Sequence, residues 1–448
     1  MKKLSNGGWD ALLPPPPMTP SEALAEANRC LMCWDAPCTR ACPTHIDVPR
    51  FIKQISTDDM LGSARTILSA NMLGASCARV CPTEVLCEGA CVLHDLHERP
   101  IEIGRLQEHA TDPVVLGGDQ IFQPGPDTGF RVAIVGAGPA GLSCGAELRR
   151  AGHSAVIFES GDQPGGLNTH GVADYKMASA TSLAEVEWVL SHGIELRLGI
   201  RVGVDVTTDA LLEEYDAVFI GTGLARSAPL GIPGEDLAGV AAALEFIGNL
   251  KSRPRDEMSL AGERVAVIGA GNTAIDASTQ AARLGADKVY LVFRRARPHM
   301  RAYDHEVELA LSDGVELVPQ AVPVEVKGAE SVEGLTCRRT ELGEAGADGR
   351  PPVTILEGTD FDLDVTRVFR ATGQVAYSDF FDGVPDVALE SGKVVVDERF
   401  RTGNARIWAG GDCINGGKEV VNAVEHGKQA ARDIDATLRS ATVLNGRS

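Results

Sequence analysis

The sequence predicts an α/β protein with an all-α N-terminal domain and two Rossmann-like dinucleotide-binding domains. Three observations predict this: a helical N-terminal stretch that holds eight cysteines, and two glycine-rich turns that each follow a short β-branched strand. The chain has 448 residues, which suggests roughly two to four domains. Its 49 glycines indicate many tight turns and close backbone approaches.

The charge balance excludes some classes of function. The chain carries 42 Lys and Arg against 62 Asp and Glu, a net charge of −20. Such an acidic chain repels phosphate backbones, so we expect no nucleic-acid partner. No apolar run reaches the roughly 18 residues of a membrane span, and the N-terminus lacks the apolar segment of a secretory signal. We therefore expect a cytoplasmic protein that does not enter a membrane.

The first part of the chain is predicted to be helical, over residues 20–110. The segment TPSEALAEANRCLMC has an N-cap signature at Thr19 or Ser21 and apolar residues with a period of 3.6, and VPRFIKQI and LGSARTILSANML repeat that period. Residues 111–128 are rich in Pro, Gly and Asp, and we interpret them as a linker. From Phe130 onward, β-branched runs alternate with helical segments, which is typical of a parallel sheet.

The clustered cysteines predict metal or redox chemistry. Of eleven cysteines, eight lie between Cys30 and Cys91, and a cytosolic chain keeps its thiols reduced. Their spacings are C-x2-C-x4-C-x3-C-P and C-x3-C-x5-C-x3-C. The first group is Cys30, Cys33, Cys38 and Cys42, followed by Pro43, and the second is Cys77, Cys81, Cys87 and Cys91. Two zinc sites are the alternative, but zinc sites usually pair C-x2-C knuckles across a longer span, so these continuous runs favour iron–sulfur clusters.

The spacing also predicts that the two cysteine groups share their ligands. In two-cluster ferredoxins the fourth cysteine of a C-P run serves the other cluster. By that pattern Cys42 crosses to the second cluster, and one cysteine of the second group crosses back. Spacing alone would then use all eight cysteines.

The first glycine-rich turn predicts an adenine dinucleotide site. In FRVAIVGAGPAGLSCGAELRRAG a strand leads into G-x-G-x-x-G and a helix, with the glycines at Gly136, Gly138 and Gly141. The first permits the tight turn, the second lets backbone approach a pyrophosphate, and the third lets helix and strand pack closely. The next strand, SAVIFE, ends at Glu159, where a ribose-binding carboxylate belongs.

The second glycine-rich turn predicts a nicotinamide dinucleotide site. The segment RVAVIGAGNTAIDASTQAARLGADKVYLVFRR has the pattern G-x-G-x-x-A at Gly269, Gly271 and Ala274. Its second strand ends at Arg294 and Arg295, and arginine suits a 2′-phosphate because guanidinium binds phosphate bidentately. NADP(H) is therefore favoured, NAD(H) stays open, and a solvated basic turn is the alternative.

The C-terminal part completes a flavin-type arrangement. The segment RIWAGGDCINGGKEVVNAVEHGKQAARDI is a strand, a turn that carries Asp412, and a long helix from near Glu419. Asp412 could accept a hydrogen bond from flavin ribityl hydroxyls, and the helix would aim its positive end at the flavin. Residues 221–223 and 371–373 are interpreted as points where the chain crosses between two domains. The expected division is 1–110, helical with two [4Fe-4S] clusters; 111–128, linker; 129–233 with 362–448, FAD domain; and 234–361, NAD(P) domain.

These motifs carry a family resemblance over about residues 20–440. The two nucleotide units and the AGGDC helix resemble the two-dinucleotide-domain flavoprotein reductases. With its cysteine region the chain resembles glutamate synthase small subunits and the N-terminal half of dihydropyrimidine dehydrogenase. CLMCWDAPCTRACPTHIDVPRFI is similar to the bacterial small subunit of the latter enzyme, and PIEIGRLQEHATD resembles the segment that holds its glutamine cluster ligand.

The resemblance implies a site residue by residue. It implies one [4Fe-4S] cluster on Cys30, Cys33, Cys38 and Cys91, and a second on Cys42, Cys81, Cys87 and Gln107, with Cys77 left free. It implies FAD contacts at Gly136, Ala137, Gly138, Pro139, Ala140, Gly141, Glu159, Gly166, Leu167, Lys176, Val202 and Asp412. It implies nicotinamide dinucleotide contacts at Ala270, Gly271, Asn272, Thr273, Arg294, Arg295, Arg301, Ala371, Thr372 and Gly373. The bacterial subunits are usually described as NAD-dependent, whereas these arginines match the NADP pattern of the longer relatives.

The resemblance also implies a partner. The longer relatives carry an FMN barrel of about 250 residues that reduces pyrimidine, and this chain ends soon after its flavin helix. We therefore expect an electron-input subunit that oxidises NAD(P)H through FAD and passes electrons to an FMN- and iron–sulfur-containing large subunit, which reduces uracil or thymine. No side chain need act as acid or base in the hydride step. A glutamate synthase small subunit, a ferredoxin:NAD(P)H oxidoreductase subunit and a zinc-stabilised scaffold without catalysis are the alternatives.

Overall fold

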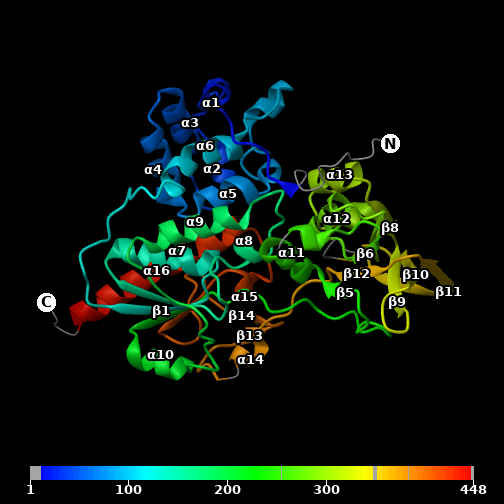
Figure 1. The fold of residues 1–448 in the computed structure, drawn as a ribbon. Helices are drawn as coiled ribbons and strands as arrows, with labels where there is room; N and C mark the ends of the chain where they lie inside the picture. The colour runs from blue at the N-terminus through cyan, green and yellow to red at the C-terminus, as the bar shows by residue number, and fades with distance from the viewer. Residues whose placement is uncertain (1–11, 254, 347–350, 382, 445–448) are drawn as a thin grey trace. The chain divides into compact units, whose positions relative to one another are not determined.

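The computed structural model describes residues 12–253, 255–346, 351–381 and 383–444 (Figure 1). The chain divides into two compact units. The larger unit comprises Pro15–Thr169, Ser179–Ala225 and Ala376–Ser448. The smaller unit comprises Met1–Pro14, His170–Ala178 and Arg226–Val375.

The larger unit begins with the predicted helices. Thr19 caps the first of them with a capping box, since its hydroxyl accepts the Glu22 N–H while the Glu22 carboxylate accepts the Thr19 N–H. Apolar residues on the inner faces, among them Phe51, Ile67 and Leu106, are fully buried, and this burial holds the short helices together. The helices are α1 (Pro20–Ala27), α2 (Pro37–Ala41), α3 (Val48–Ser56), α4 (Met60–Ala70), α5 (Gly74–Val80) and α6 (Ile103–Val115).

Helix α6 runs further than expected. It extends to Val115 and carries Pro113 in its last turns, so the helical region continues into the segment interpreted as a linker. A proline there removes one helical hydrogen bond, but Val114 and Val115 are both buried in the core. The burial of these two side chains offsets the lost bond, which the Pro and Gly content of the segment did not indicate.

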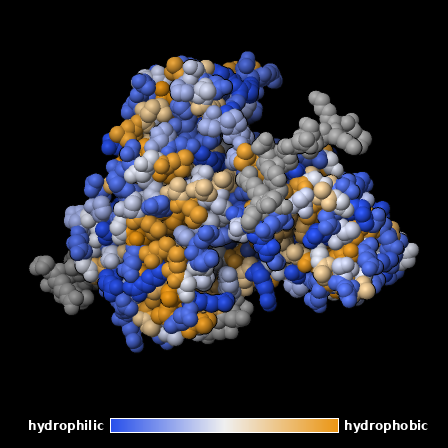
Figure 2. Space-filling model, viewed as in Figure 1, coloured by the Kyte–Doolittle hydropathy of each residue, from blue (hydrophilic) through white to orange (hydrophobic). Residues whose placement is uncertain are grey.

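The larger unit then builds a parallel sheet in the order β15-β4-β1-β2-β3. The predicted strand–turn–helix of the first glycine motif is β1 (Arg131–Val135) followed by α7 (Pro139–Ala151), and β2 (Ser154–Phe158) pairs with β1 in register Val132↔Ala155. Figure 2 shows apolar side chains gathered over this sheet, surrounded by hydrophilic ones. The other elements are α8 (Leu167–His170), α9 (Ser179–Leu190), β3 (Glu195–Arg197), α10 (Thr208–Glu214), β4 (Ala217–Ile220), α14 (Ser378–Phe381), β13 (Leu389–Glu390), β14 (Lys393–Val394), β15 (Ile407–Ala409), α15 (Asp412–Asn415) and α16 (Val420–Leu444).

The smaller unit repeats this plan with the parallel sheet β5-β12-β6-β7-β8. The second glycine motif lies between β6 (Arg264–Ile268) and α12 (Asn272–Arg283), as predicted, and the strand before the arginines is β7 (Lys288–Phe293). An antiparallel sheet of β9 (Ala321–Lys327), β10 (Gly334–Leu342) and β11 (Val353–Leu363) is added to it. The remaining elements are β5 (Val240–Ala242), α11 (Ala243–Ser252), α13 (Asp304–Ser312), β8 (Glu316–Pro319) and β12 (Arg367–Arg370).

The boundaries between the units differ from the expected ones at two places. Strand β12 pairs with β5 and β6, so the chain returns to the larger unit at Ala376 and not at residue 362. The segment His170–Ala178 belongs to the smaller unit, because polar side chains of that unit hold it. Among the described residues, none of the helices has both the length and the apolar character that a membrane crossing requires.

Candidate flavin, dinucleotide and iron–sulfur sites

Four cysteines surround one cavity in the helical region. Cys30, Cys33 and Cys38 come from the loop before α2 and from α2 itself, and Cys91 comes from the end of the second cysteine group. Met32 and Ala36 adopt left-handed backbone conformations (φ 52° and 39°), which wrap this loop around the cavity. The structure therefore brings together the four residues that the resemblance assigns to the first cluster.

The surroundings of the first cavity are apolar. Its other lining residues include Val48, Ile52 and Leu93. Burial raises the pKa of the Cys38 thiol to about 11, and burial also raises the pKa of Cys30. Thiolates at such positions need a cation to compensate their charge, and the iron of a bound cluster would supply it.

The second cavity is lined by four cysteines and one glutamine. Cys42, Cys77, Cys81, Cys87 and Gln107 all contribute to it. The Nε2 of Gln107 donates a hydrogen bond to the Gly74 carbonyl at 2.7 Å, which leaves Oε1 as the atom available for a ligand. This cavity thus offers one more donor than a four-ligand cluster needs, and both Cys77 and Gln107 are present. Across the described residues, no three or more His, Cys, Asp or Glu side chains meet as they would around a single metal ion.

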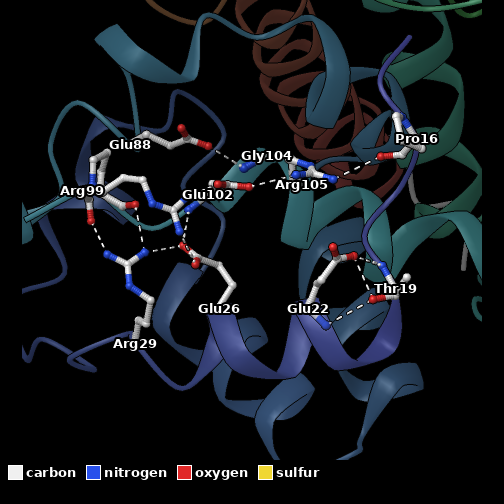
Figure 3. A network of polar contacts seen from close by, with 11 residues as sticks. Pro16, Thr19, Glu22, Glu26, Arg29, Glu88, Arg99, Glu102, Gly104 and Arg105 are labelled. Atoms are coloured by element: carbon white, nitrogen blue, oxygen red, sulfur yellow. Dashed lines mark hydrogen bonds and ion pairs between the residues drawn. The ribbon is translucent and has the colours of Figure 1, made fainter.

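A network of ion pairs fixes the backbone beside the second cavity (Figure 3). The buried Glu26 carboxylate of α1 accepts hydrogen bonds from Arg29 (2.7 Å), Arg99 (2.9 Å) and the Glu102 N–H (2.9 Å). Glu88 accepts the N–H of Gly104, a residue that lines the cavity, at 2.9 Å. Burial raises the pKa of Glu88 to about 7. These contacts tie α1 and the turn after Cys87 to the start of α6, which carries Gln107.

The first glycine turn has the geometry of a phosphate-binding loop. A Cβ on Gly136 would lie 2.5 Å from the Gly221 carbonyl oxygen, and one on Gly141 would lie 2.0 Å from the Gly136 oxygen, so only glycine fits either position. At Gly138, by contrast, the nearest atom to an added Cβ is the Gly166 Cα at 4.0 Å. The open space at Gly138, in front of the N-terminus of α7, suits a pyrophosphate.

Residues around this turn are held close to it. The Glu159 carboxylate accepts the Ala137 N–H (2.9 Å) and the Gly161 N–H (2.8 Å), which fixes the carboxylate beside the glycine loop. Gly166 lies next to Gly138, and Asn168, at 3% exposure, has an Oδ1 without a hydrogen-bond partner in the described part of the chain. A buried orphan acceptor beside a glycine cradle fits a bound cofactor that carries hydrogen-bond donors. Of the other predicted contacts in this unit, Pro139 and Ala140 begin α7, Leu167 begins α8, and Val202 is buried.

Asp412, the residue predicted to face the flavin ribityl chain, lies at the start of α15 and ahead of α16. Burial raises the pKa of Asp412, and its Oδ1 accepts the Lys418 N–H at 3.2 Å. The preceding Gly411 N–H donates to Nδ1 of His426 at 3.2 Å, so a residue of α16 holds this turn. Helix α16 packs along α7 (Figure 1), where a Cβ on Gly427 would lie 2.1 Å from the Ala140 oxygen.

Lys176 does not belong to the unit that holds the other predicted flavin contacts. It lies in His170–Ala178 of the smaller unit, and its ammonium pairs with Asp276 at 2.8 Å and Glu306 at 2.6 Å. These two carboxylates raise the pKa of Lys176, although burial acts in the opposite direction. Its assignment as a flavin contact stays a prediction.

The second glycine turn also provides a phosphate-binding loop. A Cβ on Gly269 would lie 2.3 Å from the Ala371 oxygen, whereas one on Gly271 meets no atom within 4 Å. Ala270 accepts the Arg301 N–H at 2.9 Å, and the Asn272 side chain accepts the Tyr303 N–H at 3.3 Å. The loop, Thr273 in the first turn of α12 and residues Ala371, Thr372 and Gly373 after β12 are thereby assembled in one unit.

The predicted arginines directly follow β7. Arg294 is exposed, and Arg295 is partly buried and donates from Nε to the Pro351 carbonyl at 3.2 Å. Arg301 is exposed, and its backbone is anchored to the loop that carries Gly271. Side chains that extend from this anchored turn can reach a phosphate near the end of the strand.

The sequence did not single out several residues that frame these sites. Asn71 and Val421 line the second cavity, the Thr44 hydroxyl lies 3.3 Å from the Cys42 sulfur, and Lys428 donates to the Thr44 carbonyl. Asn71 and Thr44 stand beside the cysteine groups in the sequence, which is the one local signal that could have found them. Val421 and Lys428 are distant in sequence, and only the packing of α16 brings them there.

Comparisons with known proteins agree with this geometry. Residues 130–427 match the pyridine nucleotide-disulphide oxidoreductase family, and residues 14–116 match dihydropyrimidine dehydrogenase domain II, 4Fe-4S cluster. The glutamate synthase [NADPH] small chain of Escherichia coli K12 is 36% identical over 93% of this chain and 92% of its own length. The NAD-dependent dihydropyrimidine dehydrogenase subunit PreT of the same strain is 32% identical over 95% and 97%.

Solved structures show the same fold at low sequence identity. Mycobacterium tuberculosis FprA in complex with NADPH is 22% identical, covers 71% of this chain and 86% of its own, and superimposes with a TM-score of 0.59. The thioredoxin reductase of T. acidophilum gives a TM-score of 0.55 at 22% identity, over 69% of this chain and 99% of its own. Both support two dinucleotide-binding domains. The chain therefore belongs to the pyridine nucleotide-disulphide oxidoreductase family, as an FAD- and NAD(P)-dependent oxidoreductase with an N-terminal 4Fe-4S domain.

Proposed function

We propose that this chain is the electron-input subunit of a dihydropyrimidine dehydrogenase. It oxidises NAD(P)H and passes electrons through two [4Fe-4S] clusters to a partner chain that holds FMN and reduces uracil or thymine to the 5,6-dihydropyrimidine. The observation that carries the proposal is Gln107. Its amide nitrogen is held by Gly74, and the residue lines a cavity with Cys42, Cys81 and Cys87. A glutamine in a cluster ligand set is the feature that resembles dihydropyrimidine dehydrogenase.

The packing of α16 supports an order for the electron path. Val421, in the first turn of α16, lines the second cavity, and Asp412 of the proposed flavin site lies just ahead of this helix. Short helix α2 then joins the two cavities, since Cys38 lines the first and Cys42 lines the second. With the cofactors bound, this arrangement would favour electron transfer from the flavin to the cluster held by Cys42, then to the cluster held by Cys38, and then to the partner.

The protein's own residues bind and orient the reactants in this scheme. When bound, FAD supplies the conversion of a two-electron hydride donor into single electrons. Glu159 would orient the adenosine ribose, Asp412 would accept a hydrogen bond from the ribityl chain, and the glycine loops would present N–H groups to the two pyrophosphates. No side chain acts as acid or base in the hydride step, so positioning carries the catalysis.

The arginines support NADPH as the donor. Arg294, Arg295 and Arg301 gather after β7 and beside the loop at Gly271, where the 2′-phosphate of NADPH would lie. The relative named NAD-dependent subunit PreT and the relative named glutamate synthase [NADPH] small chain differ in this preference. We expect a higher kcat/KM with NADPH than with NADH in a dye-reduction assay.

A glutamate synthase small subunit is the second candidate, and the 36% identity to such chains favours it. Purified protein combined with candidate partner chains separates the two. Uracil-dependent NAD(P)H oxidation with an FMN-containing partner is expected, and oxidation that instead requires glutamine and 2-oxoglutarate would overturn the proposal. Brown-yellow protein that bleaches with NAD(P)H is expected in either case, and colourless protein would favour a zinc-stabilised scaffold.

A further inference from the structure

Asn71 places an unpaired hydrogen-bond donor at the second cavity. It follows α4, it is 1% exposed, and it lines this cavity. Its Oδ1 accepts the Leu73 N–H at 2.9 Å, which sets the orientation of the amide. The other amide atom, Nδ2, is buried and has no hydrogen-bond partner within the described residues.

A buried donor without a partner is costly. Leaving one unsatisfied costs about 1–3 kcal/mol, and most buried polar groups in proteins are paired for this reason. The side chains that line the cavity with Asn71 and carry an acceptor are the four cysteines, Thr83 and Gln107, while Pro43, Leu86 and Val421 are apolar. The amide of Gln107 already donates to Gly74. The Gln107 oxygen is assigned to the cluster as a ligand and Thr83 offers a single hydroxyl, so the sulfurs are the acceptors that the cavity offers in greatest number to the Asn71 amide.

Thr44 provides a second donor to the same site. It is 2% exposed, and its Oγ1 lies 3.3 Å from Sγ of Cys42. A cysteine that binds iron is a thiolate without a proton, so in the ligated state the hydroxyl is the donor. Lys428 of α16 fixes both donors, since its ammonium donates to the carbonyls of Thr44 (3.2 Å) and of Ala70 (2.9 Å), which precedes Asn71.

We propose that the Asn71 amide donates a hydrogen bond to a sulfur of the cluster in the second cavity and, together with the Thr44 hydroxyl, raises the reduction potential of that cluster. A donor near sulfur stabilises the added negative charge when the cluster accepts one electron from the flavin, and no proton is transferred in that step. The inference rests on the proposed ligand assignment. It makes Asn71 and Thr44 residues that tune the potential, in addition to the ligands themselves.

The first cavity shows why the effect is confined to the second cluster. Its described lining consists of four cysteines and apolar or proline side chains, among them Leu31, Ile52 and Ile103. No hydroxyl or amide side chain is among the described residues that line it. The same substitutions should therefore leave the potential of the first cluster unchanged.

The test is an anaerobic redox titration followed by electron paramagnetic resonance on the full chain. N71S keeps an oxygen that can accept the Leu73 N–H but has no Nδ2, and T44V keeps the shape of threonine without its hydroxyl. We expect each variant to move the midpoint potential of the second cluster to a more negative value. The signal that C81S perturbs identifies this cluster. S63A is the matched control, since it removes a buried hydrogen bond to Phe51 in the same helical region without lining either cavity, and it should move neither potential.

Unchanged potentials in N71S, with about eight iron per chain retained, would overturn the proposal. If N71S loses iron, a measurement on the wild-type protein tests the proposal instead. Electron–nuclear double resonance with ¹⁵N-labelled asparagine side chains should show a ¹⁵N coupling at the second cluster and a proton coupling lost in D₂O, and the absence of both overturns the proposal. Failure of the uracil assay leaves these potentials and couplings intact, so it refutes the proposed function alone.

Discussion

Glu185 is a buried carboxyl group that should give the protein a distinctive dependence of stability on pH. It lies on α9 at 1% exposure and accepts the N–H groups of Ala75 (2.8 Å) and Ser76 (3.1 Å), together with the Ser76 hydroxyl, at the N-terminus of α5. Burial raises the pKa of Glu185 to about 7, against 4.5 for an exposed glutamate, although these hydrogen bonds lower it. Between pH 4.5 and about pH 7, the Glu185 carboxyl group therefore stays protonated in the folded state, whereas it has released its proton in the unfolded state.

The sign of the effect follows from this shift. A carboxyl whose pKa is higher in the folded state stabilises the fold below pH 4.5 and loses that contribution as pH rises through about 7. The shift from 4.5 to about 7 corresponds to about 3 kcal/mol, because one pKa unit is worth about 1.4 kcal/mol. About 2 kcal/mol of this contribution to the free energy of unfolding is lost between about pH 5.5 and about pH 8.

The substitution E185Q should remove this dependence of the free energy of unfolding on pH. Glutamine keeps an oxygen for the Ala75 and Ser76 N–H groups and does not ionise, so we expect E185Q to be more stable than wild type at about pH 8, by up to about 3 kcal/mol. Anaerobic urea unfolding at a series of pH values, followed by circular dichroism, measures the difference. An E185Q protein with the wild-type pH slope, or one less stable than wild type at about pH 8, would refute the reasoning.

Three further predictions concern the cofactor sites. C77S should retain about eight iron per chain, because Gln107 completes the second ligand set, and loss of about four iron on analysis would make Cys77 a ligand. Replacing Arg294 or Arg295 with alanine should cost about 1.5–3 kcal/mol with NADPH, about tenfold to 150-fold in kcat/KM, and little with NADH; equal losses with both donors would contradict a phosphate contact. G427A should weaken FAD binding and destabilise the fold by about 1–3 kcal/mol or more, because its Cβ would lie 2.1 Å from a backbone oxygen of α7, and a wild-type Kd for FAD with an unchanged unfolding midpoint would contradict this close packing.

Sequence patterns predicted most of the fold because the motifs are local. A β-branched strand followed by glycines at fixed spacing is a local steric requirement, so β1, α7, β6 and α12 lie where the motifs placed them. Pro113 misled the prediction of the helix end, since a turn signal in sequence does not reveal that Val114 and Val115 are buried. The return to the larger unit at Ala376 was also missed, because the sheet in which β12 pairs is set by contacts distant in sequence.

The sequence predicts some residues of the candidate site better than others. Cysteine spacing indicated two clusters with crossed ligands, and the structure gathers Cys91 with Cys30 in one cavity and Cys42 with Cys81 in the other. Spacing alone would use all eight cysteines, Cys77 included, whereas the resemblance assigns Gln107, and both residues line the second cavity. The role proposed for Asn71 was not visible at all, since it depends on a hydrogen bond that one amide atom makes and the other lacks.

The crossed arrangement of cysteines bears on how the protein is assembled and damaged. Cys38 and Cys42 are four residues apart in the sequence and line different cavities, and the same holds for Cys87 and Cys91. Binding of either cluster therefore orders both short segments, which also carry ligands of the other cluster. The two clusters should consequently be incorporated in a single cooperative step. By the same linkage, oxygen that destroys one cluster frees segments on which the other depends, and the inactivated protein should have lost both clusters, not one of the two.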